Sequence, residues 1–125
     1  FHGYTYSAHP AACAAGIATQ KLYEAHGLFE NAANLEEYFL DAIYTLKDHP
    51  LVTDIRGIGM MAGVEVASDG VPGHRGGEMQ KAMFWNGLHV KWTGDNAIVA
   101  PAFIAECKHV DEIVDKFRKT LDEMI

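Results

Sequence analysis

The apolar residues of this chain change their spacing at Pro50, and that change restricts the possible folds more than any other feature. Before Pro50 they recur every three or four positions, which is the period of one face of a helix. After it, Met60, Ala62, Val64 and Val66 alternate with other residues, which is typical of a strand with one buried face. A chain of 125 residues has room for one well-filled core. Helices and strands are therefore expected to share that core.

The local patterns predict the elements in chain order. We expect helices over about 10–27 and 28–47, strands over 51–56 and 60–66, a helix over 78–86, short strands over 88–92 and 97–100, and a final helix. Residues 68–77 are rich in glycine and polar side chains, which predicts a surface loop. The clearest amphipathic face belongs to the last helix and contains Val110, Ile113, Val114, Phe117, Leu121 and Met124. This order predicts an α+β fold, with helices packed mainly on one face of a small, largely antiparallel sheet.

Charge and composition exclude several classes of protein. The net charge of −7, without a Lys/Arg cluster, argues against nucleic-acid binding. No stretch is apolar enough to cross a bilayer, and no signal-peptide pattern occurs, so we expect no membrane partner. Cys13 and Cys107 lie far apart in different sequence settings. We expect two free, buried thiols and a cytoplasmic, reducing location.

Two further patterns, the histidines and a glycine-rich segment, could in principle form ligand sites. The seven histidines form neither a helical His-x-x-x-His pair nor a Cys/His cluster, so no metal site is expected. They are His2, His9, His26, His49, His74, His89 and His109. The glycine-rich segment 70–77 lacks the Lys-Ser/Thr ending of a phosphate-binding loop. Neither pattern predicts a bound ion.

The first ten residues carry the strongest functional signal. Aromatic rings, hydroxyls and imidazoles gather there, just ahead of Pro10, a residue that often begins a helix. The hydroxyls of Tyr4 and Thr5 can donate hydrogen bonds to an anion, and backbone N–H groups beside Gly3 can join them. From the residues alone, an aromatic-rich loop packed on the body of the protein is an equal alternative.

The order of the residues in this segment favours the ligand-binding alternative. The run His2-Gly3-Tyr4-Thr5-Tyr6-Ser7-Ala8-His9-Pro10, followed by Ala11-Ala12-Cys13-Ala14-Ala15-Gly16, resembles a signature of class III pyridoxal-phosphate aminotransferases, a family that includes omega-amino-acid:pyruvate transaminases. The resemblance implies the C-terminal small domain of a fold-type I aminotransferase over residues 28–125, preceded by an interface motif and a connecting helix over 1–27. It also implies a homodimer in which Thr5, helped by the Tyr4 backbone, binds the cofactor phosphate of the neighbouring subunit.

The resemblance further implies transfer of an amino group from an amine or omega-amino acid to a keto acid such as pyruvate. The Schiff-base lysine of the family lies upstream of this motif, and the chain opens at Phe1. We therefore expect a piece of a longer enzyme that is inactive alone, with no catalytic residue of its own. A catalytically inactive relative and a non-enzymatic α+β binding module remain as alternatives.

Two positions bear on the substrate. Arg56, in Arg56-Gly57-Ile58-Gly59, is either a clamp for a substrate carboxylate or, as we favour, a structural arginine. Many relatives have an arginine where Ile98 or Cys107 stands here. Neither side chain pairs with a carboxylate, and Lys108 is only a loose substitute. This favours amine donors, or a carboxylate-binding group outside this sequence.

Overall fold

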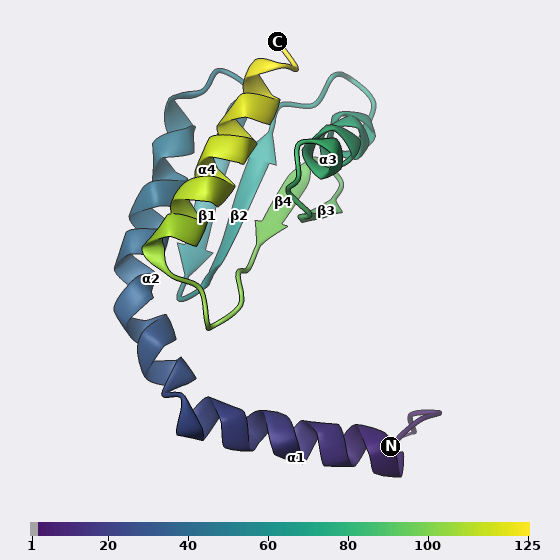
Figure 1. Ribbon diagram of the computed structural model, residues 1–125. Helices are drawn as coiled ribbons and strands as arrows, with labels where there is room; N and C mark the ends of the chain where they lie inside the picture. The colour runs from purple at the N-terminus through teal and green to yellow at the C-terminus, as the bar shows by residue number, and fades with distance from the viewer. Residues whose placement is uncertain (1–2) are drawn as a thin grey trace.

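The structure is a computed structural model that describes residues 3–125 (Figure 1). Its elements are α1 (Pro10–Ala25), α2 (Leu28–Tyr44), the short 3-10 helix η1 (Thr45–Asp48), β1 (Val52–Ile58), β2 (Met61–Val66), α3 (His74–Trp85), β3 (Lys91–Thr93), β4 (Asn96–Val99) and α4 (Cys107–Asp122). The expected order of helices and strands is confirmed, with boundaries that differ by a few residues outside α3.

The strands form one antiparallel sheet in the order β1-β2-β4-β3. The hairpin between β1 and β2 turns at Gly59, whose φ of 56° lies in the left-handed region that glycine adopts without strain. β4 then pairs with the far edge of β2, and β3 forms the other edge of the sheet. The α+β prediction with an antiparallel sheet is confirmed.

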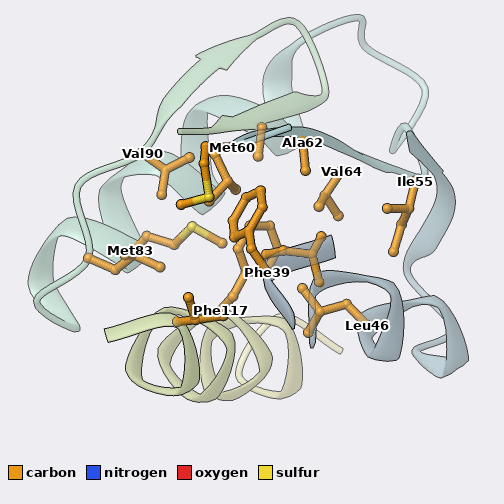
Figure 2. Packing of buried hydrophobic residues seen from close by; sticks show 14 of the residues in the cluster. Phe39, Leu46, Ile55, Met60, Ala62, Val64, Met83, Val90 and Phe117 are labelled. Atoms are coloured by element: carbon orange, nitrogen blue, oxygen red, sulfur yellow. The ribbon is translucent and has the colours of Figure 1, made fainter. Parts of the chain in front are cut away.

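The core lies on one face of this sheet, beneath α2, α3 and α4 (Figure 2). The alternating residues Met60, Ala62, Val64 and Val66 are all buried, as their spacing predicts. Phe39 of α2 and Phe117 of α4 are fully buried and fill the space between the helices and the sheet. Helix α4 meets α2 on one side and α3 on the other, so its apolar face holds the helical layer together.

The opposite face of the sheet is open. Ile58 and Met61 face each other across the hairpin there, and 75% and 52% of their surfaces are exposed. Together with Gly63 and Ile98 they line a shallow hollow of about 400 Å³. This face therefore offers apolar surface beside the charged side chain of Arg56.

Helix α1 lies apart from this body. Figure 1 shows it extending from the start of α2 and carrying the N-terminus away from the sheet. None of its residues is buried. The turn between α1 and α2 is made at Gly27, whose φ is 59°.

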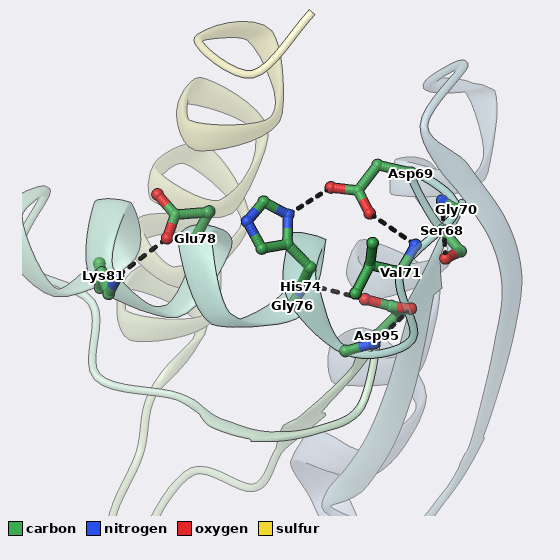
Figure 3. A network of polar contacts seen from close by, with 10 residues as sticks. Ser68, Asp69, Gly70, Val71, His74, Gly76, Glu78, Lys81 and Asp95 are labelled. Carbon is green, nitrogen blue, oxygen red and sulfur yellow. Dashed lines mark hydrogen bonds and ion pairs between the residues drawn. The ribbon is translucent and has the colours of Figure 1, made fainter.

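Helix α3 corrects the sequence prediction. It begins at His74 rather than Glu78, so the second half of the predicted loop is helical. The reason is a carboxylate from elsewhere in the chain: Asp95, in the turn between β3 and β4, accepts hydrogen bonds from the backbone N–H groups of Gly73, at 3.1 Å, and Gly76, at 2.9 Å (Figure 3). A carboxylate there satisfies helix N-terminal donors that the glycine-rich sequence leaves without a side-chain cap.

Candidate functional site

The two predicted cofactor ligands lie in an exposed turn before α1. Residues 5–8 form the turn, in which the N–H of Ser7 donates to the carbonyl of Tyr4 at 3.2 Å and the N–H of His9 to that of Tyr6 at 3.3 Å. Thr5 is exposed, and so is 75% of Tyr4. The alternative in which this segment packs on the body of the protein is therefore not what the chain adopts, and both hydroxyls are free to meet a ligand.

The electrostatic setting of this turn suits an anion. The chain carries 17 acidic residues, yet the first of them in the sequence is Glu24, near the end of α1. The first turn of α1 contains no acidic side chain, so the partial positive charge of the helix N-terminus is not neutralised there. The imidazole Nδ1 of His9 accepts from the N–H of Ala12, at 3.4 Å. Neutral hydroxyl donors ahead of such a helix fit a phosphate group.

Arg56 is engaged by carboxylates of its own sheet. Its guanidinium lies 2.6 Å from the carboxylate of Asp54 and 3.2 Å from that of Glu65. Hydrogen bonds to Asp54 and then to Glu65 raise the pKa of Arg56 further. The favoured structural interpretation of Arg56 thus agrees with its contacts. The contact with Glu65 depends on the strand register, in which Asp54 lies opposite Glu65, so no local pattern predicts it. Asp54 lies two residues before Arg56 on the same strand, and the alternation of side chains along a strand could have predicted that pair.

The two positions that bear on substrate choice lie in different places. Ile98 is on β4 and lines the hollow of the open sheet face, beside Arg56. Cys107 is the first residue of α4 and is exposed. Figure 1 shows that β4 and the start of α4 both lie away from the N-terminal end of α1, which the Tyr4–Thr5 turn precedes. The strand register brings Ile98 and Arg56 to one hollow, a juxtaposition that their separation in sequence does not reveal.

The thiols correct one expectation. Cys13 and Cys107 are both free, as expected, but both are exposed rather than buried. Burial is the usual state of a free cysteine, but no residue of α1 is buried, so Cys13 is left exposed.

Two further features are absent from residues 3–125. No three His, Cys, Asp or Glu side chains gather there in a way that could hold a metal ion. No helix in that range is both long and apolar enough to cross a membrane.

A polar network surrounds the start of α3 (Figure 3). The imidazole of His74 lies 2.6 Å from the carboxylate of Asp69, in the segment that leads into the helix. The hydrogen bond to Asp69 raises the pKa of His74, and the same bond lowers the pKa of Asp69. Asp69 also accepts from the N–H of Val71, at 3.3 Å. These contacts order the segment before α3 and lie apart from the Tyr4–Thr5 turn.

Comparison with known proteins identifies the relatives of this chain. The family described as "Aminotransferase class-III" matches residues 1–121. The chain is 43% identical to an omega-aminotransferase of Caulobacter vibrioides and 33% identical to an omega-amino acid–pyruvate aminotransferase of Pseudomonas putida. Each match covers 99% of this chain and 28% of the relative.

A solved structure gives the same result at the level of the fold. The structure of a thermostable omega transaminase mutant from Pseudomonas jessenii superimposes with a TM-score of 0.88 at 31% identity, covering 99% of this chain and 29% of that one. This chain thus spans little more than a quarter of the length of its relatives. The match extends over nearly all of its residues and includes the Tyr4–Thr5 turn, so the chain belongs to the class III aminotransferase family.

Proposed function

We propose that this chain is the C-terminal portion of a pyridoxal-phosphate-dependent aminotransferase that moves an amino group from an amine or omega-amino acid to a keto acid such as pyruvate. The names of the relatives support the reaction class. Within the chain, the proposal rests on one observation: Tyr4 and Thr5 are exposed in a segment free of acidic residues, at the start of a helix.

In the proposed site, the Thr5 hydroxyl donates to a phosphate oxygen of cofactor held in the partner subunit of a homodimer, and the backbone around Tyr4 adds a donor. Pyridoxal phosphate, when bound, supplies the electron sink for the chemistry. The part played by this chain is to hold the phosphate at a fixed place by oriented, charge-assisted hydrogen bonds. Because the ligands cross from one subunit to the other, cofactor affinity depends on the dimer.

The open sheet face supports the substrate part of the proposal. Ile58, Met61 and Ile98 give its hollow an apolar lining, and the single guanidinium beside them is already paired with Asp54 and Glu65. A substrate carboxylate that entered the hollow would compete with Asp54 and Glu65 for Arg56. An apolar amine would meet no such competition. We therefore propose that the enzyme prefers amine donors to dicarboxylic amino acids.

The proposed family role also implies how the chain is divided into parts. We propose that residues 1–27 are an interface motif with a connecting helix and that 28–125 are the small domain, a division supported by the absence of any buried residue in α1. The proposed location is the cytoplasm, which the two free thiols support. The net charge of −7 supports small molecules rather than nucleic acid as ligands.

The test replaces Thr5 in the full-length enzyme. Thr5→Ala removes one charge-assisted hydrogen bond, so we expect a loss of about 1.5–3 kcal/mol, or roughly tenfold to 150-fold in cofactor affinity. Entry of water recovers part of this loss and favours the lower end of the range. Thr5→Ser keeps the hydroxyl and should bind the cofactor almost as the wild type does. Ser7→Ala, in the same turn, is the matched control.

The measurement is a titration of the apo-enzyme with pyridoxal phosphate, with the dimer verified by sedimentation. Wild-type affinity in Thr5→Ala with an intact dimer would refute the proposed phosphate contact. An enzyme that binds the cofactor normally but converts no amine would instead identify the parent as a catalytically inactive relative.

A further inference from the structure

Helix α1 meets the rest of the chain through very little surface. Of its 16 residues, all of which the structure describes, only Tyr23 is shielded by other parts of the chain, and the others are exposed. The backbone joint at Gly27 does not fix the angle by itself, because glycine in the left-handed region has wide conformational freedom. Within residues 3–125, the contacts of Tyr23 therefore determine how α1 is held against the small domain.

Tyr23 contacts two other aromatic rings, and each of the three comes from a different segment. Its ring centroid lies 5.2 Å from that of Phe29, in the first turn of α2, with the ring planes at 89°. It lies 6.0 Å from that of Phe103, in the segment between β4 and α4. Phe29 and Phe103 are 5.8 Å apart with planes at 61°. The two pairs that include Phe29 are edge-to-face, and the Tyr23–Phe103 pair is tilted, with its ring planes at 46°. All three centroid distances lie in the favourable range for aromatic pairs, so we call the three rings the aromatic triangle.

The triangle is anchored to the folded body. Phe103 packs against the hydrophobic core. The side-chain amide of Asn31, in α2, donates to the carbonyl oxygens of Phe103, at 2.6 Å, and Ala105, at 3.0 Å. The loop that carries Phe103 is thus tied to α2, and two of the three rings have fixed positions. Tyr23 supplies the third corner and brings α1 with it.

A hollow lies beside the joint between α1 and α2, and no side chain of residues 3–125 fills it. Leu22, His26, Leu28 and Ile104 line a hollow of about 480 Å³ between the end of α1 and the same loop. Packing on that side does not prevent α1 from swinging. Within residues 3–125, the aromatic triangle is the side-chain cluster that opposes such a motion.

We propose that the aromatic triangle sets the angle between α1 and the small domain, and that Tyr23 is a positioning residue for the Tyr4–Thr5 turn; the second part rests on the proposed function. The length of α1 magnifies small changes at the joint. Its 16 residues span about 24 Å, so a rotation of about 10° displaces the far end by roughly 4 Å. A displacement of about 1 Å is enough to disturb a reactive geometry.

The two natural thiols allow a direct test in the 125-residue chain. Cys13 lies on α1 and Cys107 at the start of α4, both exposed, so spin labels on them report the distance across the joint. Labelled chain is diluted with unlabelled chain, so that only pairs within one molecule are measured. The variants are Tyr23→Ala, which removes the ring, and Tyr23→Phe, which keeps it. Ile17→Ala is the control, because Ile17 is an apolar residue on the same helix that is 60% exposed.

We expect one narrow distance distribution in the wild type, in Tyr23→Phe and in Ile17→Ala. In Tyr23→Ala the distribution should be about twofold broader or more, since α1 then turns freely at Gly27. The domain core is unaffected by this change, and an unaltered circular dichroism melt verifies it. An unchanged distribution in Tyr23→Ala would overturn the proposal, whatever the cofactor does.

A second arm tests the link to the cofactor in the full-length enzyme. Tyr23→Ala should weaken pyridoxal phosphate binding by roughly threefold to tenfold, and Tyr23→Phe should restore it. Wild-type affinity in Tyr23→Ala, together with a broadened distance distribution, would overturn the role of Tyr23 in positioning the Tyr4–Thr5 turn. It would leave the role of the triangle in setting the angle of α1. The distance measurement involves no cofactor, so a failure of the Thr5 phosphate contact is distinguishable from a failure of the triangle.

Discussion

Two neighbouring glycines of α3 should respond in opposite ways to the same substitution. A Cβ added to Gly76 would overlap the carbonyl oxygen of Gly94 and lie 2.9 Å from its carbonyl carbon and 3.1 Å from the Cα of Asp95. A Cβ added to Gly77 would meet no atom within 4 Å. Gly76→Ala should therefore destabilise the chain and Gly77→Ala should stabilise it.

The magnitudes follow from the contacts. The atoms that face Gly76 belong to backbone, so relief requires α3 to move away from the β3–β4 turn. Overpacking of this kind costs about 1–3 kcal/mol. The movement also stretches the two hydrogen bonds to the Asp95 carboxylate, for a further 1–3 kcal/mol or so. Alanine recovers about 1 kcal/mol of helix propensity, which leaves a net loss of about 1–5 kcal/mol. Gly77→Ala has only that gain of about 1 kcal/mol.

Urea unfolding of the 125-residue chain, followed by circular dichroism, measures both free energies of unfolding. The slope with denaturant should be the same for the wild type and both variants, so that the midpoints compare stabilities directly. In a thermal melt the Gly76→Ala midpoint should fall by about 3–20 °C. Equal stability of the two variants would refute the argument, because it would mean that α3 does not rest on the turn at Gly94.

Three further predictions concern the charges, the thiols and the activity. The raised pKa of His74 means that its pairing with Asp69 stabilises the segment before α3 fully below about pH 6.5, the ordinary pKa of histidine, and is lost as the pH rises through the raised value. The lowered pKa of Asp69 limits the same stabilisation on the acid side, where it is lost as the pH falls through that value. Intrinsic-rate-corrected hydrogen exchange at Val71 should therefore be slower at about pH 5.5 than at about pH 8.5; equal protection would contradict the pairing. A thiol reagent should label both Cys13 and Cys107 in the native chain without denaturant, because both are exposed, and a reaction that requires unfolding would contradict this. We expect no alanine from the 125-residue chain supplied with pyridoxal phosphate, an amine and pyruvate, because the resemblance to the family implies a Schiff-base lysine upstream of it; turnover would show that the chain carries a catalytic group.

The Tyr4–Thr5 turn shows how far sequence reasoning reached for the candidate site. The signature over residues 2–16 predicted the family, which is confirmed, because short motifs record local chemistry. The two cofactor ligands that it implies, Tyr4 and Thr5, stay a prediction. The position of that turn relative to the folded body could not be predicted from the sequence. Its exposure and its distance from the sheet depend on the angle at Gly27, which is held by rings from three separated segments.

The sequence alone determined the elements whose signal is periodic. The apolar face of α4 and the alternation along β2 follow from burial on one side, and burial imposes a period that can be read without knowing the partner. Fold class followed from the order of those elements, and an antiparallel sheet from their short connections.

Only the tertiary structure decided where α3 begins. Its first residues read as a loop because glycine has poor helix propensity, and nothing local supplies a cap. The cap is Asp95, about twenty residues further on, and Gly73 and Gly76 are required by close contact with the turn that carries it. Both the hydrogen bond and the contact join segments that are distant in the sequence, so no local pattern could contain them.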